Sequence, residues 1–282
     1  MGYHTGNRSA VGTTRAPSYP HRDFYDTPGV VKIHKDDTEL SPAEAAILSS
    51  VQCELKGRAI LDIGIGAGRT TPYLRAISRN YIGMDLSEKM IESARETIGD
   101  ARLLVCDARN MSVFGNEQFD AVFFLGAGID DVNAADRMVI LNEVNRVLRK
   151  NGIFVLSAHN LDARDAGLWS FNGFSVSPKP RIFIRDNINR LWSYIFCVIK
   201  HLLNKIHSKG YVIFLDYEDH YGQHQDRPGV LLSTYYINKN TQIQQLLDAG
   251  FYQAAALDKF GLVADTDRIR KDGFVYCMAR KK

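Results

Sequence analysis

Cysteine is scarce in this chain of 282 residues. Its four cysteines, Cys53, Cys106, Cys197 and Cys277, are far apart and form no CxxC pair, so neither a zinc site nor a disulfide framework is indicated. Cys106 and Cys277 lie in apolar runs typical of strands. This pattern favours small buried side chains in a reducing compartment.

Long apolar segments and a strong charge of one sign are also missing. No run of 18 apolar residues exists, and the N-terminus has no apolar core of a signal peptide. We therefore expect no membrane-spanning helix, and a cytoplasmic protein is the default expectation. The formal net charge is only +3 and there is no NPPY-like motif, so nucleic acid is not the expected partner.

The order of sequence patterns divides the chain into four parts. Residues 1–40 form an N-terminal arm and lid segment, polar at first and then aromatic, and the aromatic part is expected to pack on the core. Residues 41–160 alternate buried apolar strands with helices. Residues 161–234 break this rhythm as an insertion of helix and loop, which we interpret as a substrate lid. Residues 235–282 return to a helix and two strands. The alternation predicts an α/β fold, a doubly wound and mostly parallel sheet.

Helix signals are clear at two places. Ser41, Pro42 and Glu44 predict a capped helix start, with Glu44 completing a capping box. A later amphipathic helix is expected to run to Gly152.

The segment ILDIGIGAGRT, residues 60–70, is the most informative stretch. Glycines after a strand let the backbone approach a ligand, and the next helix offers its N-terminal amides. In the dinucleotide pattern GxGxxG the third glycine would stand where this chain has Arg69. Asp62 lies two residues before Gly64, where a carboxylate would repel a pyrophosphate and suit an ammonium group. A nicotinamide-dependent dehydrogenase is therefore disfavoured.

Two further acids end the next two strands. Asp85 ends YIGMD, where a carboxylate can accept both hydroxyls of a ribose, and Met90 lies one turn into the following helix, where it can cover a flat base. Asp107 ends LLVCD, where it can accept a hydrogen bond from an exocyclic amine. An ammonium, a ribose and an adenine without a phosphate describe S-adenosylmethionine.

Five segments in order carry a family resemblance: ILDIGIGAGRT, YIGMDLSEKMI, LLVCDARNM, FDAVFFLGAGID and LNEVNRVLRKNGIFVLSAHN. They resemble the successive motifs of class I S-adenosylmethionine-dependent methyltransferases, over roughly residues 41–160 and more weakly over 235–282. The resemblance implies a seven-stranded sheet whose last strand is antiparallel. It also implies a site for S-adenosylmethionine, released as S-adenosylhomocysteine. The residues of this implied site are Asp62, Gly64, Gly66, Gly68, Arg69, Asp85, Leu86, Met90, Asp107, Ala108, Leu125 and Gly126.

The proton acceptor is expected after the fourth or fifth strand. His159 ends the fifth strand, and histidine ordinarily titrates near neutrality, so it is the favoured general base. A role in orienting a loop or the cofactor is the alternative. Asp130 and Asp131 are rivals for the base, and one of them is expected to cap the helix that begins near Asn133.

The insertion holds a polar cluster and a basic segment. His220 and His224 are four residues apart, but Gly222 between them indicates a loop, so we predict no metal and include His220 in a polar substrate pocket. A solvated loop is the alternative. Segment 181–209 is rich in basic residues, and the helix expected within it is apolar over much of its circumference. This pattern predicts a lid or a homodimer contact. Peripheral contact with an anionic membrane is the other interpretation.

These patterns together predict a methyltransferase that uses S-adenosylmethionine. Its acceptor is expected to be an oxygen or nitrogen of a small molecule, such as a natural product, a sugar or a glycan precursor. An RNA or protein methyltransferase, or a non-catalytic membrane-associated protein that binds S-adenosylmethionine, are the alternatives.

Overall fold

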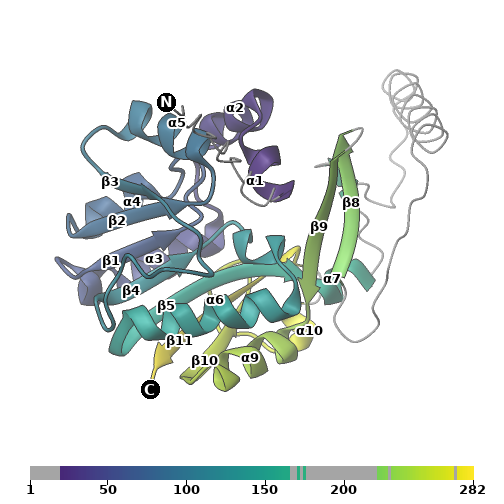
Figure 1. Cartoon of the computed structure of the whole chain (residues 1–282). Helices are drawn as coiled ribbons and strands as arrows, with labels where there is room; N and C mark the ends of the chain where they lie inside the picture. Colours follow the sequence, from purple (N-terminus) through teal and green to yellow (C-terminus); the bar gives the residue numbers. More distant parts are fainter. Residues whose placement is uncertain (1–19, 166–169, 172–173, 176–220, 228–229, 270–271) are drawn as a thin grey trace, which may run out of the picture.

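The computed structural model describes residues 20–165, 170–171, 174–175, 221–227, 230–269 and 272–282 (Figure 1). The strands are β1 (Ile60–Ile63), β2 (Tyr81–Asp85), β3 (Arg102–Val105), β4 (Phe119–Phe124), β5 (Leu148–Asn160), β6 (Ser170–Phe171), β7 (Phe174–Ser175), β8 (Tyr221–Arg227), β9 (Val230–Ile237), β10 (Phe251–Leu257) and β11 (Phe274–Lys281). The helices are α1 (Pro20–Tyr25), α2 (Pro28–Asp36), α3 (Pro42–Leu55), α4 (Thr71–Ile77), α5 (Glu88–Ile98), the 3₁₀ turn η1 (Gly128–Asp131), α6 (Ala134–Val147), α7 (Leu161–Asp165), α9 (Lys239–Asp248) and α10 (Thr266–Ile269).

Seven strands follow the predicted plan. Their order is β10-β11-β5-β4-β1-β2-β3, and the neighbours from β5 to β3 are parallel. Strand β11 runs antiparallel to both β5 and β10. The α/β fold with an antiparallel last strand is therefore confirmed.

The main sheet has nine strands, two more than predicted. β9 pairs in parallel with the end of β5 through His159 and Asn160, and β8 pairs antiparallel with β9. The expectation of a loop around Gly222 was wrong, because residues 221–227 pair along β9 as a strand. Figure 1 shows the β8–β9 hairpin extending away from the rest of the sheet.

Apolar side chains cover both faces of the sheet. Neighbouring residues of β1 face opposite ways: Ile60 packs in the cluster with α3, α4 and α5, whereas Leu61 packs in the cluster with α6 and α9. Both side chains are fully buried. Two helical layers on one sheet are the doubly wound arrangement, and they leave the carboxyl ends of the parallel strands available for a site.

Two helix boundaries test the helix signals directly. α3 has the predicted capping box, in which Ser41 Oγ accepts the Glu44 N–H and the Glu44 carboxylate accepts the Ser41 N–H. The predicted end of the later helix at Gly152 was wrong, because α6 ends at Val147. The next residue, Leu148, is buried and pairs with Phe119 as the start of β5, so burial in the sheet overrides helix continuation.

Several predictions lie outside the described residues. They concern residues 1–19, all of segment 181–209 with its lid, dimer and membrane interpretations, and His220. The four domain boundaries stay predictions, and β9 runs across the one at residue 234. No helix among the described residues is long and apolar enough to cross a membrane.

Candidate functional site

One cavity of the described part of the chain has a volume of about 690 Å³. It lies at the carboxyl ends of the parallel strands, where ligands bind in open α/β sheets. The N-terminal helices α1 and α2 contribute His21, Tyr25 and His34 to its wall, and the segment from Asp37 to Glu44 closes another side. The aromatic segment of the first 40 residues therefore packs on the core, as predicted.

Gly64 and Gly66 form the floor of the cavity after β1. Their φ angles are +66° and +55°, in the left-handed region that favours glycine. A Cβ on Gly64 would lie 2.8 Å from the ring of Phe124, so a larger residue has no room there. These two glycines leave the loop backbone open to the cavity, and their contact with a ligand stays a prediction.

Gly68 has a different structural role. It is not part of the cavity wall, and a Cβ at this position would lie 2.2 Å from Cδ1 of Ile98. The φ of Gly68 is +97°, which also favours glycine. The third glycine therefore lets α5 pack closely against the loop, and its contact with a ligand stays a prediction.

Asp85 at the end of β2 holds the glycine loop. Its Oδ2 accepts the Gly66 N–H at 2.8 Å, and its Oδ1 accepts the Ser87 N–H at 2.8 Å. Burial raises the pKa of Asp85, although these two N–H groups partly oppose the shift. Leu86 and Met90 line the cavity beside it. A carboxylate next to two apolar side chains suits a ribose followed by a flat base.

Asp62 is fully buried behind the wall and does not line the cavity. Its Oδ2 accepts the hydroxyls of Thr70 at 2.6 Å and Tyr81 at 2.9 Å. Burial raises the pKa of Asp62 to about 7, against the effect of these two hydrogen bonds. Thr70 does line the cavity, so Asp62 is joined to the wall by the hydroxyl of Thr70.

Asp107 and Ala108 line the cavity after β3. Burial alone would raise the pKa of Asp107, but the guanidinium of Arg109, 2.7 Å away, holds it below its usual range. Arg109 also donates to Asp136 at the start of α6, at 2.9 Å. Both oxygens of Asp107 already accept hydrogen bonds from the backbone N–H and the guanidinium of Arg109, so the contact with an exocyclic amine stays a prediction.

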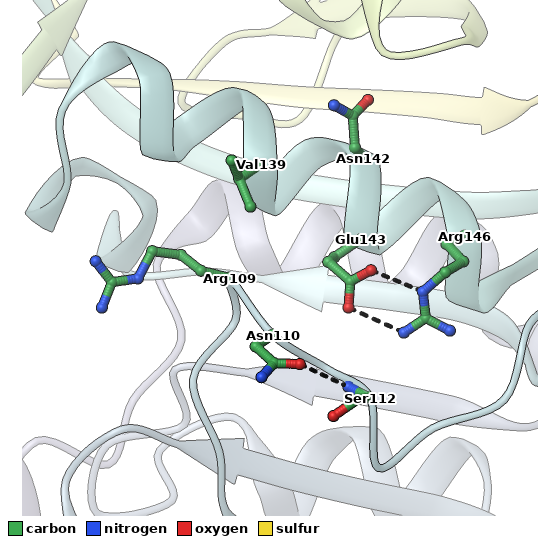
Figure 2. A pocket seen from close by; sticks show the side chains of 7 residues that line it. All are labelled: Arg109, Asn110, Ser112, Val139, Asn142, Glu143 and Arg146. Carbon is green, nitrogen blue, oxygen red and sulfur yellow. Dashed lines mark hydrogen bonds and ion pairs between the residues drawn. The ribbon is translucent and has the colours of Figure 1, made fainter.

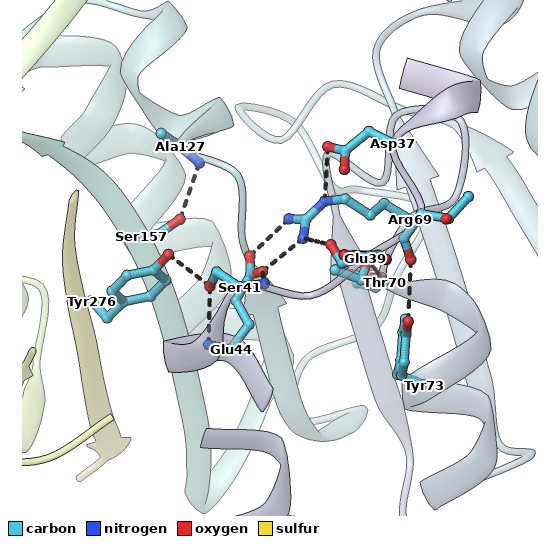
Figure 3. Close-up of polar contacts among 12 residues, drawn as sticks. Asp37, Glu39, Ser41, Glu44, Arg69, Thr70, Tyr73, Ala127, Ser157 and Tyr276 are labelled. Carbon is cyan, nitrogen blue, oxygen red and sulfur yellow. Dashed lines mark hydrogen bonds and ion pairs between the residues drawn. The ribbon is translucent and has the colours of Figure 1, made fainter. Parts of the chain in front are cut away.

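Arg69 joins the glycine loop to the start of α3 (Figure 3). Its guanidinium donates to both carboxylate oxygens of Glu44, at 2.6 and 2.7 Å, and to the carbonyl of Glu39 at 3.1 Å. Burial alone would raise the pKa of Glu44, but Arg69 and Ser41 hold it below its usual range. Ser41 also shares a hydrogen bond with Tyr276 Oη at 3.0 Å. Arg69 thus lines the cavity as the partner of a buried acid.

The turn after β4 brings Leu125, Gly126 and Asp131 to the wall. Ser157 of β5 accepts the Ala127 N–H at 3.0 Å and so holds this turn (Figure 3). Tyr25 donates to the Asp131 carboxylate, and His21 Nδ1 lies 3.4 Å from its Oδ1. Burial raises the pKa of Asp131 to about 7 in spite of the hydrogen bond from Tyr25.

Asp130 faces the core, away from the cavity wall. It forms a fully buried ion pair with Arg137 and accepts the backbone N–H of His159 at 2.5 Å. His159 Nδ1 lies 2.9 Å from the same Asp130 oxygen. His159 does not line the cavity formed by the described residues, but its ring packs 5.1 Å from that of Phe274, which does. The role of His159 as a base stays a prediction.

The sequence reasoning missed the contributions of Tyr25, His34, Phe274 and Tyr276 to the wall. None of them belongs to a recognisable motif, and only their fold positions bring them to the strand ends. The capping signal at Glu44 did reveal an ordered helix start close to the site. This capping signal did not indicate that Glu44 would pair with Arg69.

A second depression lies between α6 and the segment after β3 (Figure 2). Its volume is about 500 Å³, and Arg109, Ser112 and Val139 are among its lining residues. Glu143 and Arg146, which also line it, form an ion pair with each other and bond the backbone of Met111. Its polar groups serve the fold, so the cavity at the strand ends is the candidate site.

The chain was compared with known proteins. Residues 60–152 match the family model of the methyltransferase domain. An uncharacterised protein of Methanocaldococcus jannaschii is 34% identical over 113 residues, which cover 39% of this chain and 41% of that protein. The demethylmenaquinone methyltransferase of Thermotoga maritima is 31% identical over 105 residues, covering 36% and 44%. The chain thus spans less than half the length of these curated relatives.

Solved structures show the same fold. An S-adenosylmethionine-dependent methyltransferase of Clostridium acetobutylicum has a TM-score of 0.56 at 13% identity, covering 92% of this chain and 96% of that one. The 1,6-didemethyltoxoflavin-N1-methyltransferase of Burkholderia thailandensis, solved with S-adenosylhomocysteine, has a TM-score of 0.50 at 14% identity, covering 95% and 93%. Residues 60–152 thus match a methyltransferase domain, in a chain with the class I methyltransferase fold.

Proposed function

We propose that this protein is a methyltransferase that moves a methyl group from S-adenosylmethionine to an oxygen or nitrogen of a small molecule. One observation carries the proposal. A single cavity of about 690 Å³ is bounded by the glycine loop and Asp85 on one side and by α1 and α2 on the other. Cavities of about 300–1,000 Å³ are typical of small-molecule sites, so one volume has room for a cofactor and a small acceptor side by side.

The residues of the wall fit the cofactor. Asp85 would hold the ribose, Met90 and Leu86 would cover the adenine, and Asp107 would receive its amine. Gly64 and Gly66 leave the space that the methionine part needs, and Thr70 offers a hydroxyl that Asp62 orients. S-adenosylmethionine supplies an electrophilic methyl group on a sulfonium.

The enclosure by the N-terminal helices supports a small acceptor. Tyr25 of α1 bonds Asp131 of the core, and Arg69 bonds the segment that joins α2 to α3. A site closed in this way excludes water and limits the size of what enters. Two of the similar proteins are named for demethylmenaquinone and for 1,6-didemethyltoxoflavin, which agrees with a small acceptor.

The deciding experiment is calorimetric titration of the full chain with S-adenosylmethionine, S-adenosylhomocysteine and NAD, followed by an acceptor screen with labelled methyl. We expect the first two to bind and NAD not to bind. Label found in small molecules supports the proposal. Label found only in RNA or protein, or no binding of S-adenosylhomocysteine, would overturn it.

A further inference from the structure

Charge in the candidate cavity is unevenly balanced. The described part of its wall contains seven carboxylates, two arginines and no lysine. The carboxylates are Asp37, Glu39, Glu44, Asp85, Asp107, Asp131 and Asp136. A cleft lined by an excess of one sign concentrates ligands of the opposite sign.

Both arginines are already paired with acids of this wall. Arg69 holds Glu44 and lies 3.7 Å from Asp37, and Arg109 holds Asp107 and Asp136. Neither guanidinium is directed at Asp131. The nearest cationic group of the described residues to Asp131 is His21, at 3.4 Å, and a histidine is charged only when protonated.

Asp131 also has the position that an acceptor contact needs. It follows β4 on the turn that brings Leu125 and Gly126 to the wall, at the end of the cavity where α1 covers the core. Its two described partners, Tyr25 and His21, both come from α1. A carboxylate accepts up to about four hydrogen bonds, so Asp131 keeps capacity for one more donor.

Aromatic rings also line the cavity. Phe274 of β11 pairs across the sheet with His159, the residue that Asp130 holds beside Asp131. Tyr276 is two residues further along the same face of β11, with its ring 6.4 Å from that of Phe274. The faces of aromatic rings attract cations. A wall that combines a carboxylate, bonded to Tyr25, with further aromatic rings has the chemistry that recognises an alkylammonium ion.

We propose that Asp131 binds the methyl acceptor directly and that the acceptor is an amine, which enters the cavity as its ammonium ion. This inference rests on the proposed function and narrows it from oxygen or nitrogen to nitrogen. Asp131 takes one proton from the ammonium. The freed lone pair forms the new bond to the methyl carbon, and the electron pair of the carbon–sulfur bond stays on sulfur, which becomes a thioether.

The test uses three probes of one shape on the full chain saturated with S-adenosylhomocysteine: 2-phenylethylamine, 2-phenylethanol and phenylacetate. They share a ring and a chain length but present an ammonium, a hydroxyl and a carboxylate. Calorimetry at pH 8 should show the amine binding about tenfold or more tightly than the alcohol, because a hydrogen bond to a charged group is the stronger kind. Phenylacetate should not bind.

Asp131→Asn should abolish this preference for the amine and leave the affinity for S-adenosylhomocysteine unchanged. The matched control is Asp23→Asn, which removes an exposed carboxylate of α1 that is outside the cavity wall and should change neither affinity. The comparison of the three probes on the unmodified protein needs no variant, so it decides the matter even if Asp131→Asn does not fold.

Three results would overturn the inference: equal or tighter binding of the alcohol or the carboxylate, an unchanged amine preference in Asp131→Asn, or binding of none of the probes. If S-adenosylhomocysteine binds and the amine does not, the inference alone fails. If S-adenosylhomocysteine itself does not bind, the proposed function fails with it.

Discussion

Asp130 and Asp131 are consecutive in the chain, yet their carboxylates belong to different environments. Asp130 is paired with Arg137 in the core, and Asp131 lines the cavity beneath Tyr25. The 3₁₀ turn η1 directs successive side chains to different sides, since such a turn has three residues per turn. One acid is therefore part of the core, and its neighbour faces the cavity.

The pH dependence of amine binding follows from Asp131. Burial raises its pKa to about 7; hydrogen bonding from Tyr25 and the charge of His159 oppose the shift, and Asp130 and Asp85 add to it. Only the ionised carboxylate pairs with an ammonium, so the affinity for 2-phenylethylamine should rise from pH 6 to pH 8. Calorimetry at intervals of half a pH unit measures this rise.

A flat pH profile for Asp131→Asn would support this assignment of the titrating group. If the variant shows the same rise as the unmodified protein, another group controls the pH dependence.

Asp85→Ala should weaken binding of S-adenosylhomocysteine by at least about tenfold, because a hydrogen bond to a charged group contributes about 1.5–3 kcal/mol. The variant loses the acceptor for the ribose and also the anchor of Gly66. Calorimetry checks the affinity. Asp100→Ala is the control, since Asp100 is an exposed acid that pairs with Arg75 away from the cavity. Unchanged affinity in Asp85→Ala would remove the ribose assignment.

Arg69→Met should lower the free energy of unfolding by about 3 kcal/mol, because it leaves the buried carboxylate of Glu44 without its guanidinium. Adding Glu44→Gln should recover part of the loss, since the amide is neutral and its oxygen still caps α3. Urea unfolding measures all three proteins.

Arg280→Met serves as the matched control for Arg69→Met. Arg280 also bonds both oxygens of an acid, Glu54, but at the surface, so its loss should cost less than about 1 kcal/mol. Equal losses from the two arginine variants would show that burial of Glu44 does not matter.

Asp62→Asn should change the pH dependence of stability. Because the pKa of Asp62 is raised to about 7 in the folded protein, the folded state keeps a proton that the unfolded chain releases above about pH 4. The unmodified protein therefore loses stability as pH rises towards 7, by roughly 1.4 kcal/mol per pH unit from this group. The asparagine does not ionise and escapes this loss.

Urea unfolding at pH 5, 6, 7 and 8 tests the sign. The stability of Asp62→Asn relative to the unmodified protein should increase from pH 5 to pH 7 and then level off. Asp248→Asn, an exposed acid at the end of α9, should show no such trend. A relative stability of Asp62→Asn that decreases with pH would contradict the raised pKa.

Features that depend on a few neighbouring residues were predictable from the sequence. The cap at Ser41, the loop at Gly64 and Gly66, and the acids at Asp85 and Asp107 all follow from local strand–loop–helix patterns. The same local pattern predicts that Gly68 belongs to the ligand-binding loop. Its contact is with Ile98, thirty residues later, which a local pattern does not contain.

Features that depend on long-range packing were not predictable. The pairing of Glu44 with Arg69 and the pairing of β9 with β5 join distant segments of the chain. Likewise, the sequence around Asp130 and Asp131 does not indicate which of the two acids pairs with Arg137. The packing of α6 and α1 against the sheet determines these contacts, and no spacing pattern in the sequence predicts them.

Glu44 completes the cap of α3 and also holds Arg69 of the glycine loop. One carboxylate thereby links the first turn of a helix to the loop that would hold the methionine part of the cofactor. The two segments should open and close as one cooperative unit, with amide hydrogens that exchange with solvent at a common rate. Ordering the loop with a ligand would then slow exchange at Ala45 and its neighbours in the first turn of α3, although none of these amides touches the ligand.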